Sequence, residues 1–291
     1  MSTGPGAHRA AVLGSPVAHS LSPALHRAAY AALHLDGWRY DAVDVAEDRM
    51  AAFLAGLDGS WAGLSLTMPL KRVVRPLLVR ESALATAVGA VNTVTFTERG
   101  PVGDNTDVHG VVAALAEAGT TRADAAAVLG GGATACSAVA ALQVLGVIGP
   151  TVHVRAPERS GDVVAAGERL GLAVALRPLD VDAVVAAAPQ VVVSTLPAGA
   201  ADAVAAGLAD RLVAPAVAAG RPVPVLLDVI YAPWPTALAA AWQAAGGPVV
   251  SGFAMLLHQA AEQVRLMTGH EPPVAAMRAG AEAEIARRAA G

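Results

Sequence analysis

The chain has 291 residues, a formal net charge of −4 and a pI near 6.0, so neither nucleic acid nor an anionic membrane surface is expected as a partner. Its one cysteine, Cys136, excludes an intramolecular disulfide framework and is typical of a reducing compartment. The N-terminus lacks the layout of a signal peptide, and proline and glycine interrupt the uncharged stretches 183–201 and 229–257. We therefore expect a cytoplasmic protein without a membrane span.

The N-terminal part of the chain alternates short apolar runs with helical patterns. The expected elements are strand 10–13, helix 23–33, strand 38–45, helix 47–57, strand 61–66, helix 70–79, strand 91–96 and helix 108–118. This rhythm predicts a parallel or mixed sheet covered by helices.

The pattern restarts after Gly119, which is expected to end the preceding helix as a C-cap. Strands are expected at 125–129, 151–155, 191–194 and 223–229, with helices ending near Leu145 and at 159–170 and 236–245. Two more helices, 253–267 and 274–289, lie beyond the sheet pattern. The predicted fold class is α/β with two domains, of which the second is a doubly wound, Rossmann-type nucleotide-binding domain.

A glycine-rich turn opens the second block. Gly130-x-Gly132-x-x-Ala135 follows an apolar strand and begins a helix, which is the context that a dinucleotide-binding turn requires. Gly130 permits the tight turn, Gly132 lets backbone N–H groups approach a pyrophosphate, and the small Ala135 lets helix and strand pack closely. A tight turn without a ligand is the alternative, and the context favours the cofactor.

The end of the next strand predicts which nucleotide is bound. An acidic residue there would hold the ribose 2′-hydroxyl of NAD, whereas arginine would meet the 2′-phosphate of NADP. The segment carries Arg155 and Arg159, with Glu158 between them. Two guanidinium groups favour NADP, and Glu158 keeps NAD open as the second possibility.

Lys71 is the only lysine among the 20 Lys and Arg residues of the chain. Arginine stays protonated, whereas a lysine ammonium can give up a proton in suitable surroundings. A lysine retained against this composition is therefore a candidate catalytic residue. The alternative is a chance survivor on a solvated face.

Polar side chains gather at loop positions around the strand ends of the first block, where α/β proteins build their sites. They are Ser20, Ser22, Thr67, Lys71, Asn92 and Asp107. The two serines can cap the following helix, or they can bind a carboxylate or hydroxyls at its N-terminus. Neither His19 nor His26 has partners at metal-ligand spacing, and no metal site is expected.

Taken in order, these segments resemble the shikimate dehydrogenase family, and the likeness extends over roughly residues 10 to 270. Three later motifs carry it further: Ser194-Thr-Leu-Pro-Ala-Gly199, Asp228-Val-Ile-Tyr231-x-Pro233-x-x-Thr236 and Gly252-Phe-Ala-Met255-Leu-Leu-His-Gln259. Each motif is modestly specific, whereas the ordered set is very specific.

The resemblance implies reversible reduction of 3-dehydroshikimate to shikimate with NADPH, a step of aromatic amino acid biosynthesis through chorismate. It implies that Lys71 and Asp107 are the catalytic pair. The residues implied to hold the substrate's carboxylate and hydroxyls are Ser20, Ser22, Thr67, Asn92, Tyr231 and Gln259. Those implied to hold NADP are Gly130, Gly131, Gly132, Ala133 and Thr134 at the pyrophosphate, Arg155 and Arg159 at the 2′-phosphate, and Val229 and Gly252 at the nicotinamide.

The resemblance also implies the domain organisation. A substrate-binding domain would span residues 1–107 and a Rossmann-type dinucleotide-binding domain residues 108–251, with C-terminal helices over 252–291 that pack back on the first domain. The expected assembly is a monomer or a homodimer.

Several residues depart from the family pattern. Ser65 stands where the family usually has Asn, and Ala133 and Thr134 stand where Gly and Ala are common. Val154 and Ala156 replace the Asn and Thr on either side of the first arginine, which removes two polar partners of the ribose phosphate.

Two alternatives therefore stay open. The first is a quinate/shikimate dehydrogenase that also uses NAD, which the altered 2′-phosphate segment permits. The second is a paralogue that binds the metabolite or NADP without catalysis. The presence of both Lys71 and Asp107 argues against the second.

Overall fold

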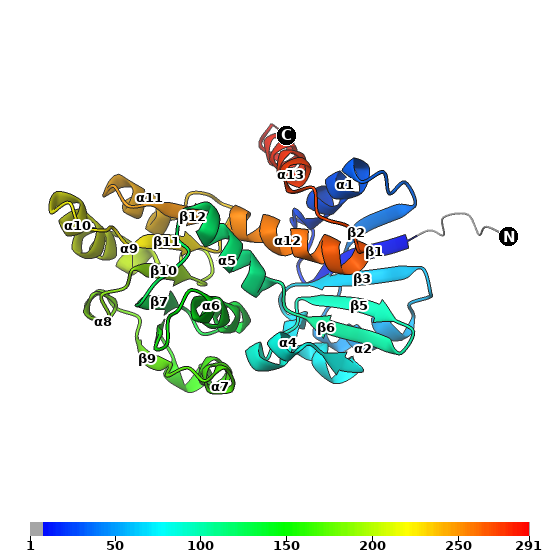
Figure 1. Cartoon of the computed structure of the whole chain (residues 1–291), viewed down its shortest axis with the longest axis horizontal. Helices are drawn as coiled ribbons and strands as arrows, with labels where there is room; N and C mark the ends of the chain where they lie inside the picture. Colours follow the sequence, from blue (N-terminus) through cyan, green and yellow to red (C-terminus); the bar gives the residue numbers. More distant parts are fainter. Residues whose placement is uncertain (1–7, 291) are drawn as a thin grey trace. The chain divides into compact units, whose positions relative to one another are not determined.

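The structure is a computed structural model that describes residues 8–290. The extreme N-terminus, for which no signal peptide was expected, lies outside the described residues. The chain divides into two compact units (Figure 1): unit 1 comprises residues 1–86, 90–106 and 256–291, and unit 2 comprises residues 87–89 and 107–255. Within residues 8–290, no helix combines the length and apolar character needed to cross a bilayer.

A mixed six-stranded sheet forms the centre of unit 1, in the order β2-β1-β3-β5-β6-β4. β1 is parallel to β2 and β3, β5 is antiparallel to β3 and β6, and β4 is parallel to β6. The strands are β1 (His8–Gly14), β2 (Trp38–Asp44), β3 (Trp61–Leu66), β4 (Arg80–Glu81), β5 (Thr93–Thr97) and β6 (Gly100–Asp104). The helices are α1 (Ser22–Ala32), α2 (Met50–Ala55), α3 (Leu70–Val73), α4 (Ala83–Val88), α12 (Gly252–Thr268) and α13 (Val274–Ala289).

One face of this sheet carries an apolar core. Leu13 and Leu64, on neighbouring strands, join Met50 of α2 and Leu70 of α3 in one buried cluster. Side chains alternate between the two faces of a strand, so Gly63 and Ser65, on either side of Leu64 in β3, face the opposite side of the sheet.

The opposite face is packed closely against α12 and includes polar side chains. A Cβ on Gly63 would lie 2.6 Å from the Met267 side chain of α12, so only glycine lets the helix approach this far. Ser65, two residues along β3, donates a hydrogen bond to Gln263 of the same helix. The sheet of unit 1 therefore has one apolar face and one partly polar face. The partly polar face packs against α12, which carries the predicted site residue Gln259.

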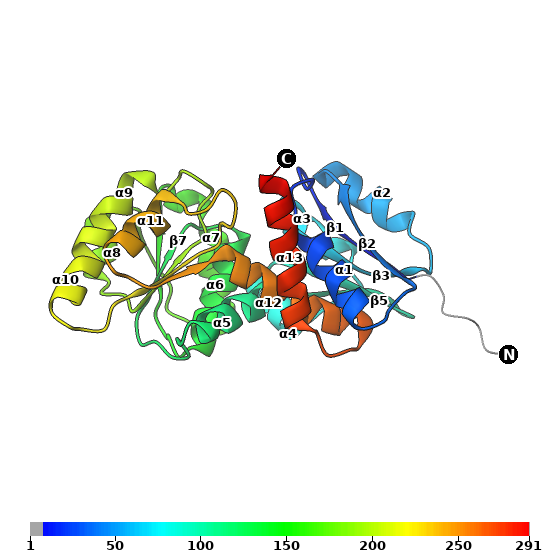
Figure 2. The same ribbon diagram turned by 90° about the horizontal axis from the view of Figure 1, so that it is seen from above.

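α13 lies beside α1, which covers part of unit 1 (Figure 2). A Cβ on Gly280 would lie 2.5 Å from that of Ala28, so small residues set the distance between the two helices. Arg288 of α13 donates hydrogen bonds to the carbonyl oxygens of His19 (2.6 Å) and Ser20 (3.2 Å). The last helix therefore holds the loop that precedes α1.

Unit 2 is a doubly wound domain around a fully parallel sheet, in the order β12-β11-β10-β7-β8-β9. The strands are β7 (Ala126–Leu129), β8 (Thr151–Val154), β9 (Ala175–Pro178), β10 (Val191–Ser194), β11 (Val225–Asp228) and β12 (Val249–Ser251). The helices are α5 (Asp107–Glu117), α6 (Ala133–Val144), α7 (Gly161–Leu170), α8 (Val181–Ala186), α9 (Asp202–Leu208), α10 (Ala214–Ala218) and α11 (Ala237–Ala244), with a π-helical stretch at Ala209–Val213 before α10. α5, α6 and α7 pack as one layer, and α8, α9 and α11 as another (Figures 1 and 2).

This strand order has a reversal point between β7 and β10, the first and fourth strands of the unit. Ligands of doubly wound sheets bind beyond the carboxyl ends of the strands at such a point. The glycine-rich turn follows β7 directly, so it lies where this topology builds a nucleotide site.

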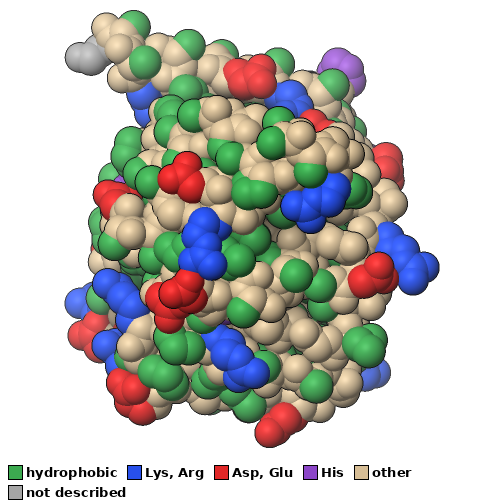
Figure 3. Space-filling view, turned by 90° about the vertical axis from the view of Figure 1, so that its left-hand side faces the viewer, with side chains coloured by type: hydrophobic (Ala, Val, Ile, Leu, Met, Phe, Trp, Pro, Cys, Tyr) green, Lys and Arg blue, Asp and Glu red, His purple; other side chains and the backbone are tan. Residues whose placement is uncertain are grey.

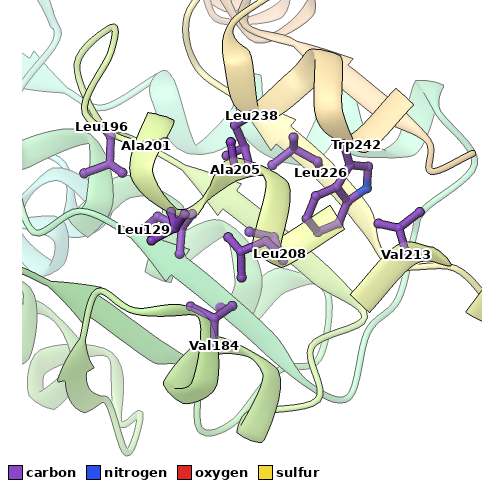
Figure 4. Close-up of a cluster of buried hydrophobic side chains, with 13 residues drawn as sticks. Leu129, Val184, Leu196, Ala201, Ala205, Leu208, Val213, Leu226, Leu238 and Trp242 are labelled. Atoms are coloured by element: carbon purple, nitrogen blue, oxygen red, sulfur yellow. The ribbon is translucent and has the colours of Figure 1, made fainter. Parts of the chain in front are cut away.

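Trp242 is part of the hydrophobic core between the sheet and α9 and α11 (Figure 4). Its side chain is fully buried, and its indole N–H donates to the Pro224 carbonyl oxygen at 3.0 Å. We expect Trp242→Ala to lower the free energy of unfolding by about 3–5 kcal/mol, because it leaves a large cavity and an unpaired carbonyl.

Urea unfolding followed by circular dichroism measures this loss, and Trp234, which is 36% exposed in the same unit, provides the matched control. Trp234→Ala is expected to change the free energy of unfolding by less than about 0.5 kcal/mol. Equal destabilisation by the two substitutions would contradict the assignment of Trp242 to the core.

The observed elements differ from the predicted ones in several places. The helix expected at 70–79 ends at Val73 and is followed by a 3₁₀ turn at Arg75–Leu77, because Pro76 cannot donate the backbone hydrogen bond that would continue the helix. The strands β4, β6, β9 and β12 were not predicted. They are short, and β9 and β12 are edge strands without a clear apolar run.

On the face drawn in Figure 3, basic, acidic and hydrophobic side chains are intermixed. Exposed ion pairs such as Arg287–Glu284 and Arg211–Asp182 contribute little to stability.

Candidate functional site

The loops that follow β1 and β3 interlock at one edge of the sheet in unit 1. The Thr67 N–H donates to the Leu13 carbonyl oxygen at 2.9 Å, and a Cβ on Gly14 would overlap the Thr67 side chain. Thr67 is half-buried, and α3 begins three residues later with half-buried Lys71 in its first turn. The predicted residues Thr67 and Lys71 therefore lie at the carboxyl edge of this sheet.

Asn92 precedes β5, which runs antiparallel to β3, so it reaches the same edge of the sheet. Its carbonyl oxygen accepts a 2.7 Å hydrogen bond from the Leu66 N–H, and the neighbouring Val91 N–H donates to the Lys71 carbonyl oxygen at 2.8 Å. These backbone bonds join the segments that carry Thr67, Lys71 and Asn92.

The side chain of Asn92 is 1% exposed and has a fixed orientation. Its Oδ1 accepts from the Thr106 N–H (2.7 Å) and from the Thr93 hydroxyl (2.8 Å). Because a backbone N–H can only donate, these bonds identify the oxygen of the amide. Nδ2 therefore points the other way, toward the Thr106 hydroxyl (3.0 Å) and the Gln259 Oε1 (3.4 Å). Asn92 can offer a hydrogen-bond donor to a ligand oxygen on the side of Gln259.

Gln259 lies on α12 and is 7% exposed. Its Nε2 donates to the Leu256 carbonyl oxygen at 2.9 Å, which directs Oε1 toward Asn92. The two amides that the sequence predicted to bind substrate thus meet in one cluster, although they are 167 residues apart in the chain.

Ser20 and Ser22 lie at the beginning of α1. The Ser22 N–H donates to the Ser20 hydroxyl at 3.2 Å, whereas the N-cap position of α1 is Leu21 and has no side-chain cap. Ser20 is half-buried and Ser22 is buried, and the Ser22 hydroxyl hydrogen-bonds with Tyr40 of β2.

Sequence reasoning missed Gln263, which contacts the same cluster from one helical turn beyond Gln259. Its Nε2 donates to the Thr93 hydroxyl (2.9 Å) and to the Asn92 carbonyl oxygen (3.3 Å), and its Oε1 accepts from the Ser65 hydroxyl (2.7 Å). The signal was the i, i+4 spacing of the two glutamines, which places them on one face of a helix.

In unit 2, the turn after β7 is shaped by its glycines. Gly130 has φ +108°, a conformation that favours glycine, and a Cβ there would lie 2.6 Å from the Thr195 hydroxyl oxygen. Thr195 also donates its hydroxyl to the Leu129 carbonyl oxygen at 3.0 Å, which ties together the ends of β7 and β10.

The first turn of α6 is open to an anion. Gly132 occupies its N-cap position without a side-chain cap, and a Cβ on Gly132 would find no atom within 4 Å. Uncapped backbone N–H groups at a helix N-terminus bind phosphate oxygens. Gly131, Ala133 and Thr134, all half-buried, complete a turn that fits a dinucleotide pyrophosphate.

The loop after β8 packs against this turn. A Cβ on Gly131 would lie 2.6 Å from the Ser160 hydroxyl oxygen, and this hydroxyl donates to the Ala156 carbonyl oxygen at 3.1 Å. Arg155 and Arg159 of the loop are exposed. Their guanidinium groups are thus available to an anion bound beside the glycine-rich turn, which fits a 2′-phosphate.

The two residues predicted at the nicotinamide are in direct contact. A Cβ on Gly252 would overlap the Val229 carbonyl oxygen, and the Gly252 N–H donates to the Ile230 carbonyl oxygen at 3.2 Å. Both residues follow the carboxyl ends of strands β11 and β12, at the sheet edge that the glycine-rich turn also follows.

Asp228 organises the turn that carries half-buried Tyr231. Its carboxylate accepts from the Ile230 N–H (3.2 Å) and from the Thr236 hydroxyl (2.7 Å), and that hydroxyl also caps α11 by accepting from the Ala239 N–H (3.1 Å). Burial raises the pKa of the Asp228 carboxyl, and the Thr236 hydrogen bond opposes this shift. The sequence motif included Asp228 and Thr236, but their role in shaping the turn was not predicted.

Asp107 is the first residue of α5, belongs to unit 2 and is 5% exposed. Tyr231 belongs to the same unit, whereas Ser20, Ser22, Thr67, Lys71, Asn92 and Gln259 belong to unit 1. Among residues 8–290, no group of three or more His, Cys, Asp and Glu side chains is arranged to hold a metal ion.

Comparison with known proteins identifies relatives over the length of the chain. Residues 12–94 match the family model of the shikimate dehydrogenase substrate binding domain, and residues 252–279 match that of the shikimate 5′-dehydrogenase C-terminal domain. The chain is 37% identical to the shikimate dehydrogenase (NADP(+)) of Oleidesulfovibrio alaskensis, over 92% of each sequence.

Solved structures agree with this relationship. The crystal structure of Mycobacterium tuberculosis shikimate dehydrogenase is 41% identical with a TM-score of 0.83, and the match covers 95% of this chain and 99% of that one. The Thermus thermophilus shikimate 5-dehydrogenase in complex with NADP(H) and shikimate is 31% identical with a TM-score of 0.79, with the same coverage.

Proposed function

Because the chain belongs to the shikimate dehydrogenase family, we propose that it catalyses the reversible NADPH-dependent reduction of 3-dehydroshikimate to shikimate, in aromatic amino acid biosynthesis. One observation carries the proposal: the backbone carbonyl oxygen of the chain's only lysine accepts from the Val91 N–H, next to Asn92, whose buried side chain meets Gln259. A lysine next to oriented hydrogen-bond donors suits the reduction of a polyhydroxylated ketone.

Lys71 is proposed to act on the substrate oxygen. When bound, NADPH supplies the hydride. Reduction of a ketone leaves negative charge on its oxygen, and an ammonium group can stabilise that charge and donate a proton to it. The carboxylate of Asp107 is proposed to orient Lys71 and to offset the cost of taking its charge out of water.

Six residues are proposed to hold the substrate's carboxylate and hydroxyl groups. They are Ser20, Ser22, Thr67, Asn92, Tyr231 and Gln259. The orientation of Asn92 supports this role, because its Nδ2 faces Gln259 and can donate to a substrate hydroxyl while Gln259 can accept from one.

The cofactor site is proposed to lie at the carboxyl edge of the sheet in unit 2. The turn from Gly130 to Thr134 would hold the pyrophosphate, and Val229 and Gly252 would line the nicotinamide pocket. The positive φ of Gly130 and the open space above Gly132 support this assignment. Unit 2 then corresponds to the predicted dinucleotide-binding domain and unit 1 to the substrate-binding domain.

Arg155 and Arg159 are proposed to select NADP over NAD. We expect the double substitution Arg155→Ala, Arg159→Ala to raise KM for NADP roughly 10- to 100-fold, because charge-assisted hydrogen bonds to the 2′-phosphate are lost. KM for NAD is expected to stay within about twofold, since NAD lacks this phosphate.

Initial rates of shikimate oxidation at varied NADP and NAD check this expectation. Arg221→Ala, which removes an exposed arginine elsewhere in unit 2, is the matched control and is expected to leave both KM values unchanged. A parallel rise in KM for both cofactors would show that the two arginines do not read the 2′-phosphate.

Steady-state oxidation of shikimate and quinate, each with NADP and NAD, tests the function as a whole. The proposal expects shikimate with NADP to give the highest kcat/KM. Binding of shikimate or NADP without turnover would instead support the non-catalytic paralogue.

A quinate/shikimate dehydrogenase that also uses NAD is the second candidate. Val154 and Ala156 favour it, because they offer no side-chain hydrogen bonds to the ribose phosphate beside Arg155. Comparable kcat/KM values for quinate, or for NAD, would establish this candidate. A cytoplasmic location and a monomeric or homodimeric state stay predictions.

A further inference from the structure

A layer of buried polar side chains lies between α12 and the sheet of unit 1, directly behind Asn92. Gln263 is its centre and is 1% exposed. The amide donates through Nε2 to the Thr93 hydroxyl (2.9 Å) and the Asn92 carbonyl oxygen (3.3 Å). It accepts through Oε1 from the Ser65 hydroxyl (2.7 Å), and the His26 Nε2 lies 3.3 Å from the same oxygen.

The orientation of the Gln263 amide is defined, because its Nε2 faces the Asn92 carbonyl oxygen, which can only accept. Because the Gln263 Oε1 can only accept, His26 must carry its proton on Nε2, which leaves Nδ1 as the acceptor that faces the Tyr30 hydroxyl at 3.5 Å. Burial lowers the pKa of His26 to about 3, so the ring is neutral and has this single donor. The Tyr40 hydroxyl donates a hydrogen bond to the Ser65 hydroxyl at 2.5 Å, and the Ser65 hydroxyl donates in turn to the Gln263 Oε1.

This pattern prevents the Gln263 amide from rotating. A flipped amide would place its oxygen against the carbonyl oxygen of Asn92, where neither atom can donate, and Ser65 and His26 would have to give up their bonds to Oε1. Each mispaired buried group would lose its hydrogen bond without gaining one from water, which is costly in a buried network.

α12 therefore holds Asn92 with two glutamines one helical turn apart. Gln259 meets the side-chain Nδ2 of Asn92, and Gln263 meets its carbonyl oxygen. Gln263 also acts through the Thr93 hydroxyl, which donates to the Asn92 Oδ1 at 2.8 Å.

We propose that Gln263 is a positioning residue that fixes Asn92 in the orientation needed to bind substrate, with Ser65 and His26 holding Gln263 in turn. The inference rests on the proposed function of Asn92 as a substrate-binding residue. The inference explains why polar side chains are buried on this face of the sheet, whereas the other face is packed with apolar side chains.

Gln263→Leu tests the proposal by kinetics, because leucine has a similar volume but cannot hold Asn92. We expect KM for shikimate to rise roughly 10- to 100-fold, with a smaller change in kcat, and KM for NADP to stay within about twofold. Val264→Ala is the control, since Val264 is fully buried on the same helix and its truncation destabilises the fold without removing a polar group. A similar rise in KM for both variants, or none for Gln263→Leu, would overturn the proposal.

A spectroscopic measurement separates this inference from the proposed function. Asn92 and Asn105 are the only asparagines of the chain, so selective ¹⁵N-asparagine labelling yields two side-chain NH₂ groups in an NMR spectrum. The Asn105 group donates to the Ala90 carbonyl oxygen at 2.9 Å and serves as the internal reference.

We expect Gln263→Leu to shift or broaden the Asn92 NH₂ signals, while the Asn105 signals stay in place. The Val264→Ala protein should give wild-type positions for both groups. Unchanged Asn92 signals in Gln263→Leu would overturn the positioning role whether or not the wild type oxidises shikimate. Conversely, the wild type could show no turnover while Gln263→Leu still shifts the Asn92 signals. That result would refute the proposed function and leave the positioning role intact.

Discussion

Replacing Lys71 by alanine is expected to lower kcat for shikimate oxidation by roughly 10²- to 10⁴-fold, the usual contribution of general acid–base catalysis. The substituted protein should still bind shikimate, because Asn92 and Gln259 remain oriented by backbone and side-chain bonds that do not involve the Lys71 side chain. Initial rates at 340 nm give kcat, and isothermal titration with shikimate gives binding.

Two further variants separate charge from proton transfer. Lys71→Arg keeps a cation but cannot readily release a proton, so it is expected to recover only part of the lost rate. Arg72→Ala removes the adjacent, exposed cation of α3 and is expected to change kcat by no more than about twofold. Wild-type turnover by Lys71→Ala would assign the lysine to a structural ion pair and leave the reaction without its proposed proton donor.

The doubly wound unit was predictable from sequence because its central strands are buried on both faces. Val191–Ser194 is buried at all four positions and therefore reads as a continuous apolar run. The edge strand Ala175–Pro178 gives no such signal, since it contains Arg177 and a proline and is only partly covered. Within unit 2, position in the sheet, more than intrinsic propensity, determined which strands the sequence could reveal.

The sequence could propose candidate site residues because each belongs to a local motif, in most cases at a strand end. Their supporting residues were not found, because their roles arise only from tertiary packing. Ser65 and Gln263 are 198 residues apart, and nothing in either segment indicates that one will donate to the other. Ser65 had been noticed only as a departure from the family's usual Asn. Its contact with Gln263 shows that the serine is part of the buried layer behind Asn92.

His26 illustrates the same limit. The sequence analysis found no metal-ligand spacing around it, and the structure places it fully buried beside Gln263 and stacked on Tyr40 at a centroid distance of 3.9 Å. Its neutrality follows from burial, which a sequence pattern does not report. Protonation of a buried His26 would require acid well below neutral pH, so the hydrogen-bond directions in this layer hold throughout the physiological range.

Asp107→Asn is the second substitution with a large expected effect. Asparagine keeps the size and the hydrogen-bonding oxygen of the side chain but removes the negative charge proposed to orient and stabilise Lys71. We expect kcat to fall roughly 10²- to 10³-fold, within the range for loss of a catalytic acid–base partner. Initial rates with shikimate and NADP measure the loss.

The fold should tolerate this change, because asparagine is also acceptable at the start of a helix and the lost interaction with the helix dipole is worth about 0.3–1 kcal/mol. Asp202→Asn is the matched control. Asp202 is likewise the first residue of a helix in unit 2, α9, but it is exposed. We expect Asp202→Asn to share the small loss of stability and to keep wild-type kcat. Equal kcat values for the two variants would mean that Asp107 contributes only to the helix, and that Lys71 acts without a carboxylate partner.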